Sequence, residues 1–177
     1  MDVISLNNKE YNVIKLLGKG KGGYSYLVTD GSNNYVLKQI HHEPCSYYQF
    51  GNKLLSEKND YSRLKETGIN MPEMLDIDEE NERILKQYID GPTAYELVAN
   101  DEMKPEYIEQ IKQMCSVLYP KGINIDYFPT NFILSDGQLW YIDYECNNYM
   151  DEWNFENWGI NYWSKTKEFC EYFENHK

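Results

Sequence analysis

Three polar side chains near the ends of apolar runs carry the clearest chemical signal in this sequence. Asp126 and Asn131 are separated by four residues, and Asp143 follows two short apolar runs joined by the turn sequence Ser135-Asp-Gly137. For phosphoryl transfer, a protein mainly has to supply a carboxylate that orients a hydroxyl group and oxygen ligands that bind Mg²⁺. The segment therefore predicts a site for a divalent cation and a phosphate. The same residues also fit an ordinary loop with Asx turns, so other parts of the chain must decide.

A glycine-rich stretch, Gly18-Lys-Gly20-Lys-Gly-Gly23, lies between two β-rich runs, 11–17 and 24–29. A dinucleotide-binding fold requires a helix after its glycines, and a Walker loop requires Gly-Lys followed by Ser or Thr. Neither pattern is present. The remaining phosphate-binding design is a glycine-rich hairpin, whose backbone amides can approach phosphates closely. A flexible hairpin with no ligand is the alternative.

Lys38 and Glu57 are the next candidates. Lys38 lies among apolar residues in a strand predicted over 35–40. Glu57 lies in the middle of a helix predicted over 47–66, where apolar residues recur near helical spacing. It is also the only acidic residue between Glu43 and Asp60. We expect Lys38 and Glu57 to form an ion pair.

The remaining elements predict an α+β fold. Runs 74–78 and 83–88 indicate a hairpin that completes a five-stranded antiparallel sheet. Thr93 can cap a short helix that ends at Asn100, and Pro105 can begin another that ends near Tyr119. The apolar stripe of the second helix predicts core packing. The last 32 residues are rich in aromatic side chains and predict core together with a closing helix.

Composition limits the classes of function. The chain has 177 residues and a net charge of -12, enough for one domain or two small lobes. Residues 1–70 hold 9 Lys and Arg against 7 Asp and Glu, whereas residues 71–177 hold 8 against 22. This balance argues against direct nucleic-acid binding, which needs clustered basic residues, and it allows a cationic substrate. Solubility alone is the simpler explanation of the charge.

The four cysteines lie far apart, without the spacing of a zinc site, as expected for reduced thiols. No apolar stretch is long enough for export or membrane insertion. We therefore expect a cytoplasmic protein that makes no membrane contact.

Taken together, the glycines, Lys38, Glu57 and the three later residues occur in the order and at the distances of the protein-kinase-like superfamily. Residues 11 to about 146 resemble its small atypical members: lipopolysaccharide-type kinases, the kinase of the tRNA-modifying KEOPS complex, and aminoglycoside and choline phosphotransferases. The resemblance implies a bilobal fold. Residues 1–88 would form an N-lobe with the five-stranded sheet and one helix, and residues 89–177 a strongly truncated helical C-lobe.

The resemblance also implies ATP and Mg²⁺ as cofactors. Gly18, Gly20 and Gly23 would cover the nucleotide phosphates, and Lys38, held by Glu57, would bind the α- and β-phosphates. Backbone groups near Gln87 and Ile89 would bind the adenine edge.

In the later segment, the resemblance implies that Asp126 orients the acceptor hydroxyl and that Asn131 and Asp143 ligate Mg²⁺. The sequence departs from the family pattern where Asn124 replaces the usual histidine and where Tyr144-Glu145 replaces Phe-Gly. An Ala-Pro-Glu segment is also missing, so we expect no switching by loop phosphorylation. A peptide substrate would need a protein partner to complete the C-lobe.

These observations predict a phosphotransferase that moves the γ-phosphoryl group of ATP to an unidentified hydroxyl acceptor. A small metabolite is slightly favoured over a protein as the acceptor, and the acidic second half of the chain allows this metabolite to be cationic. The alternative is a catalytically weak nucleotide-binding pseudokinase that acts as a regulatory or scaffold subunit. A third hypothesis is an unrelated α+β domain with coincidental motifs.

Overall fold

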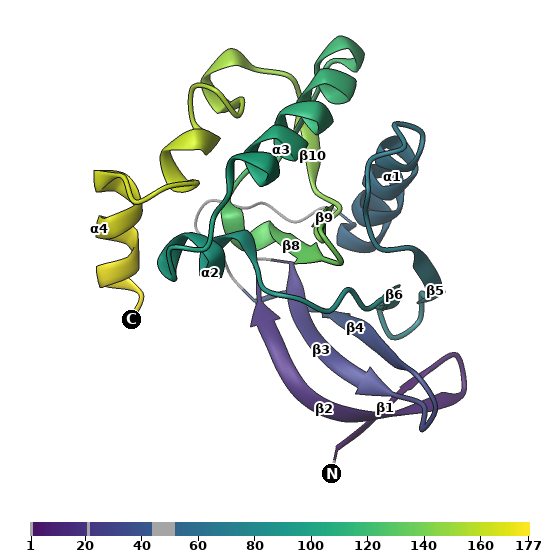
Figure 1. Ribbon diagram of the computed structural model, residues 1–177. Coiled ribbons are helices and arrows are strands. Elements are labelled where there is room, and N and C mark those ends of the chain that lie inside the picture. Colours follow the sequence, from purple (N-terminus) through teal and green to yellow (C-terminus); the bar gives the residue numbers. More distant parts are fainter. Residues whose placement is uncertain (1, 21, 44–51) are drawn as a thin grey trace. The chain divides into compact units, whose positions relative to one another are not determined.

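The computed structural model describes residues 2–20, 22–43 and 52–177 and has an α+β architecture (Figure 1). The chain divides into two compact units. The first comprises Met1–Asn59 and Pro72–Tyr88, and the second comprises Asp60–Met71 and Ile89–Lys177. Residues 60–71, which the sequence analysis places in the first lobe, are thus grouped with the second unit.

The first unit is built on one antiparallel sheet that curls strongly along β2 and β3 (Figure 1). Its strand order is β1-β2-β3-β4-β6-β5. The strands are β1 (Val3–Leu6), β2 (Lys9–Lys19), β3 (Gly23–Thr29), β4 (Asn34–Ile40), β5 (Met74–Asp78) and β6 (Arg83–Gln87). Two register shifts in the β2–β3 pairing mark bulges, which bend and twist a strand.

The prediction of five strands is wrong, because β1 adds a sixth. Leu6 pairs with Lys9 across a two-residue turn formed by Asn7 and Asn8, whose φ values are 48° and 66°. Positive φ at both central residues is the type I′ geometry that suits a tight hairpin, and asparagine tolerates it better than most residues. The Asn-Asn pair was therefore a turn signal that the prediction overlooked.

The sheet encloses two small apolar clusters. One contains Leu6, Val28, Leu37 and neighbouring residues, and the other contains Ile40, Leu54 and Ile84. Leu54 belongs to α1 (Lys53–Lys65), which confirms a helix in the predicted 47–66 segment. The predicted start of that helix and one of the four cysteines, Cys45, lie outside the described residues.

The second unit contains α2 (Ala94–Ala99), α3 (Pro105–Leu118) and α4 (Lys167–Asn175). It also has two strand pairs, β7 (Ile123–Ile125) with β10 (Cys146–Asn148), and β8 (Phe132–Ser135) with β9 (Gln138–Tyr141). The predicted helix starts are confirmed: the Thr93 side chain accepts a hydrogen bond from the Glu96 N–H, and Pro105 is the first residue of α3. Asp136 and Gly137 form the β8–β9 turn with φ values of 50° and 75°.

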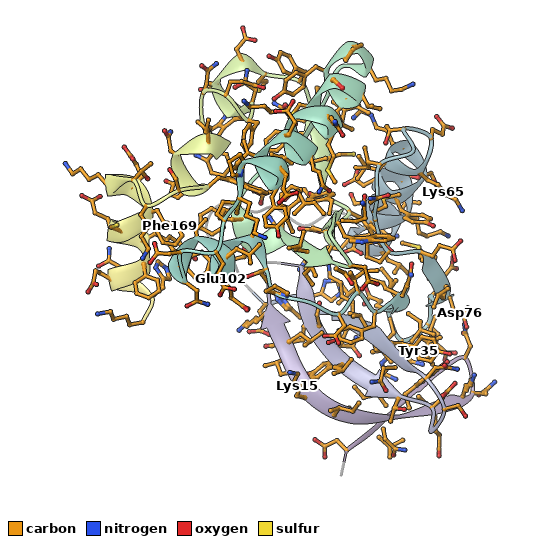
Figure 2. The ribbon with its side chains drawn as sticks, viewed as in Figure 1. Lys15, Tyr35, Lys65, Asp76, Glu102 and Phe169 are labelled. Atoms are coloured by element: carbon orange, nitrogen blue, oxygen red, sulfur yellow. The ribbon has the colours of Figure 1, made fainter. Side chains whose placement is uncertain are left out.

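Aromatic and aliphatic side chains form the core of the second unit. Ile111, Cys115 and Leu118 of the α3 stripe are buried with Phe155 and Trp163, as predicted. Phe169 of α4 points toward α2 (Figure 2). Its ring centroid is 5.2 Å from that of Tyr95 in α2. Among the described residues, no helix has the length and apolar character needed to cross a membrane. Cys115, Cys146 and Cys170 are free thiols.

Candidate functional site

The glycine-rich hairpin is tied to the residues that follow β4. The Gly20 N–H donates to the Gly23 carbonyl at 2.9 Å, and the His41 N–H donates to the Gly22 carbonyl at 3.1 Å. The His41 ring nitrogen Nε2 lies 2.8 Å from the Gly20 carbonyl oxygen. These bonds hold the backbone of the hairpin end in a defined conformation. Lys21 lies outside the described residues.

Gly23 is required by packing inside the sheet. A Cβ at this position would lie 2.5 Å from the Gln39 carbonyl oxygen and 3.1 Å from Lys38 Cε. Gly18 and Gly20 show no comparably close approach. Packing therefore explains the glycine at position 23 but not those at positions 18 and 20, and phosphate binding by the three glycines stays a prediction.

Lys38 and Glu57 are brought together, as predicted. The Lys38 ammonium, from β4, donates to Oε1 of Glu57, from α1. Both side chains are largely buried, with exposed fractions of 16 % and 15 %. Glu57 Oε2 is buried and accepts no hydrogen bond from the described residues. The pair also lies next to the glycine hairpin, because a Cβ at Gly22 would be 3.9 Å from Lys38 Nζ.

The predicted adenine contacts fall at the boundary of the two units, since Gln87 belongs to the first and Ile89 to the second. The Gln87 N–H donates to the Glu73 carbonyl at 2.9 Å, and its side-chain oxygen accepts from the Glu73 N–H at 3.1 Å. Adenine binding near these residues stays a prediction.

Asp126 lies directly after β7. Its carboxylate oxygen Oδ1 accepts from the Phe128 N–H at 3.1 Å, which is an Asx turn. Its carbonyl accepts from the Asn131 side-chain amide at 3.4 Å, so the two ends of the Asp-x4-Asn segment are joined. Next to them, the Ile142 N–H donates to the Asn131 carbonyl at 2.9 Å, which brings Asn131 beside the residue that precedes Asp143.

Asp143 and Asn131 each present an oxygen without a hydrogen-bond partner among the described residues. Asp143 Oδ1 accepts from the backbone N–H groups of Tyr144 at 2.7 Å and Glu145 at 3.3 Å, whereas Oδ2 accepts none. The Asn131 amide uses its nitrogen to bond Asp126, and its oxygen is not used within the described chain. In the parts that the structure describes, no three His, Cys, Asp or Glu side chains gather as a metal site. A cation here would depend on Asn131, Asp143 and ligands from elsewhere.

Tyr141 organises this segment, and the sequence analysis missed it. Its hydroxyl accepts from the Asp126 N–H at 3.2 Å and donates to the Glu145 carbonyl at 2.7 Å. Full burial raises the pKa of Tyr141 well above its ordinary range, and the negative charge of Asp143 acts in the same direction. The signal was available, because Leu139 and Tyr141 alternate with Trp140 in a short strand and a buried tyrosine hydroxyl needs a partner.

Three further residues lie near these segments in the second unit: Asn124, Asp60 and Tyr144. Asn124, where the family usually has histidine, is buried, and its side-chain nitrogen donates to the Met150 carbonyl at 3.0 Å. Asp60 of α1 accepts from the Cys146 N–H at 3.5 Å. Burial raises the pKa of Asp60, and the charge of Asp143 adds to this effect. Tyr144 is fully buried against Tyr61, with ring centroids 4.8 Å apart.

Comparison with known proteins gives partial similarities. No family model matches the chain. Over 64 residues, 35% of the chain, it is 41% identical to the serine/threonine-protein kinase ppk13 of Schizosaccharomyces pombe. Over 100 residues, 56% of the chain, it is 31% identical to a probable bifunctional tRNA threonylcarbamoyladenosine biosynthesis protein of Methanococcus maripaludis, in two strains. The chain spans 18% of the length of each relative. These matches support a kinase-like relationship for part of the chain.

Proposed function

We propose that this protein is an ATP- and Mg²⁺-dependent phosphotransferase that acts on a hydroxyl group. The observation that carries the proposal is the Lys38–Glu57 ion pair, held next to the glycine-rich hairpin. A largely buried lysine held by a carboxylate partner has a fixed position, which is what binding of nucleotide phosphates requires.

The residues of each unit fit their expected ligands. In the first unit, a side chain at Gly22 would occupy the space next to the Lys38 amine, so glycine leaves room there for a phosphate. In the second unit, the unused oxygens of Asn131 and Asp143 are the hard ligands that Mg²⁺ prefers. ATP would supply the transferable phosphoryl group, and Mg²⁺ would neutralise charge on its phosphates.

In this proposal Lys38 binds phosphate oxygens and Glu57 holds the lysine in place. Asn131 and Asp143 hold the metal ion, and Asp126 accepts a hydrogen bond from the acceptor hydroxyl and orients its oxygen for attack. Backbone groups near Gln87 and Ile89 bind the adenine edge. Phosphoryl transfer with these parts is mainly positioning and charge stabilisation.

For the acceptor we favour a small hydroxyl compound. The 22 acidic residues of the second half against 8 basic ones favour a cationic acceptor, because opposite charge raises the local concentration of substrate. A protein acceptor would require a partner chain that supplies the docking platform.

The test combines binding and turnover. Thermal stabilisation by ATP with Mg²⁺ and transfer of radioactive phosphate to a panel of hydroxyl compounds are measured for the wild type, Asp143→Ala and Asp126→Ala. The proposal expects Asp143→Ala to weaken metal-dependent nucleotide binding, and Asp126→Ala to spare binding and abolish transfer. Binding without transfer or autophosphorylation in the wild type would instead identify a nucleotide-binding pseudokinase. No stabilisation by ATP would reject both.

A further inference from the structure

The second unit contains a hollow of about 600 Å³ that none of the candidate catalytic residues lines. It lies at the start of α3, between the segment that leads into the helix and the residues just before α4. Met103, Ile108, Ile160 and Trp163 supply apolar walls. Its volume is within the range of small-molecule sites, and an apolar lining with a few polar groups is typical of them.

The charged side chains around the hollow are mainly basic. Lys104, Lys112 and Lys165 line it, which is three of the eight Lys and Arg residues of the second half of the chain. Lys165 is paired with Asp101 at 3.0 Å. Lys104 and Lys112 form no ion pair with any described residue, and Glu109 is the remaining acidic side chain of the lining.

Lys104 is the residue immediately before α3, and Ile108 and Lys112 lie within the helix. Residues four apart lie on one face of an α-helix, so Ile108 and Lys112 share one face of α3, and Lys104 lines the same hollow from the position before the helix. In a chain with a net charge of -12, solubility does not require such a basic face. Two ammonium groups beside apolar walls match a ligand with an apolar body and one anionic group.

We propose that this hollow binds a small amphiphilic anion, an apolar chain or ring that carries one carboxylate or phosphate group. The apolar part would contact Ile108 and Ile160 beside the nearly buried Trp163, and the anionic group would pair with Lys104 and Lys112. An extended polyanion fits less well, because only three basic residues line the hollow and the surrounding half of the chain is acidic.

Trp163 offers a direct reporter of binding. It is 1 % exposed, and its indole N–H donates to the Tyr127 carbonyl at 2.7 Å. The experiment follows the assigned indole N–H resonances of the full chain by NMR during titration with octanoate and with octyl phosphate. Octan-1-ol and octylammonium are the neutral and cationic probes of equal chain length. Trp140 and Trp153, which do not line the hollow, are internal references.

The proposal expects a saturable shift of the Trp163 resonance with octanoate, octyl phosphate or both, at concentrations about tenfold lower than with octan-1-ol or octylammonium. The anion that binds more tightly shows whether the hollow prefers a carboxylate or a phosphate group. The double variant Lys104→Gln/Lys112→Gln should weaken anion binding about tenfold, whereas the control Lys121→Gln/Lys177→Gln, with the same loss of charge, should not.

Equal binding of octan-1-ol and the anions would overturn anion recognition, and so would equal effects of the two double variants. Absence of a saturable Trp163 shift with every probe would show that the hollow is not a binding site. The probe comparison uses the wild-type chain, so it stands even where a variant fails to fold. No nucleotide enters the experiment, and its outcome is independent of the proposed phosphotransferase activity.

Discussion

The Tyr141 hydroxyl joins the backbone just before the candidate catalytic loop to the backbone after Asp143. Tyr141→Phe keeps the ring and removes this link, which leaves the Asp126 N–H and the Glu145 carbonyl without that partner. We expect the free energy of unfolding, measured by urea denaturation, to fall by about 1–3 kcal/mol. We also expect a larger loss in turnover than in nucleotide binding, since Asp126 is displaced.

Tyr127→Phe is the matched control for this change. Tyr127 is also fully buried, but its hydroxyl has no hydrogen-bond partner among the described residues. Removing it should leave stability within about 0.5 kcal/mol of the wild type or raise it. Equal destabilisation by the two variants would show that the Tyr141 hydrogen bonds contribute nothing specific.

The Lys38–Glu57 pair can be measured by a double-mutant cycle. Lys38→Met leaves a largely buried carboxylate without its ammonium partner, and we expect a loss of about 1–3 kcal/mol in unfolding free energy. The cycle of Lys38→Met, Glu57→Gln and the double variant should give a coupling free energy between the two side chains of at least about 0.5 kcal/mol.

The next residue of the same helix provides the control for this cycle. Lys58 pairs with Glu79 at 3.0 Å, but these side chains are 38 % and 72 % exposed. The cycle of Lys58→Met with Glu79→Gln should give a coupling below about 0.5 kcal/mol. A coupling for Lys38 and Glu57 no larger than this would contradict a fixed buried pair and would weaken the proposed role of Lys38.

At the scale of elements, Asp78 links two hairpins of the sheet. Its carboxylate accepts from the Asn7 N–H in the β1–β2 turn at 3.0 Å and from the Asn81 N–H and side-chain amide, both at 3.0 Å, after β5. These hydrogen bonds, the one from Asn7 first, lower the pKa of Asp78 from 3.8 to about 2. The carboxylate form is therefore the one that the folded protein stabilises.

The lowered pKa of Asp78 determines the direction in which the stability of the fold changes with pH. A carboxyl group with a lower pKa in the folded state stabilises the fold above its unfolded pKa and loses that effect as the pH falls toward its folded pKa. We expect the stability difference between the wild type and Asp78→Asn to be constant above about pH 5 and to shrink from about pH 4 toward pH 2. Urea denaturation across this range, with Asp2→Asn as the control, measures it. A difference that grows as the pH falls would refute the linkage.

Elements with a strong local pattern were predictable, and those set by distant contacts were not. The sequence signal lies within the segment itself for β2, β3 and β4, for the capped helix α2 and for the apolar stripe of α3. All of these elements are present in the structure. The strand β1 was missed because four residues carry little periodicity and their pairing depends on the Asn7-Asn8 turn. Tyr141 and Asp60 were missed because their partners are 15 and 86 residues away in sequence.

At the scale of the whole molecule, the candidate residues belong to both units, with Lys38 and Glu57 in the first and Asp126, Asn131 and Asp143 in the second. The proposed function requires that all of them act on one nucleotide. Addition of ATP with Mg²⁺ should therefore slow amide hydrogen exchange in β2 to β4 and also in segments 124–131 and 141–145. Asp143→Ala should reduce the protection in both places, because the metal ion links its carboxylate to the phosphates. Protection confined to one unit would contradict a shared site, even if the nucleotide binds tightly, and would leave the second group of residues without the role proposed for it.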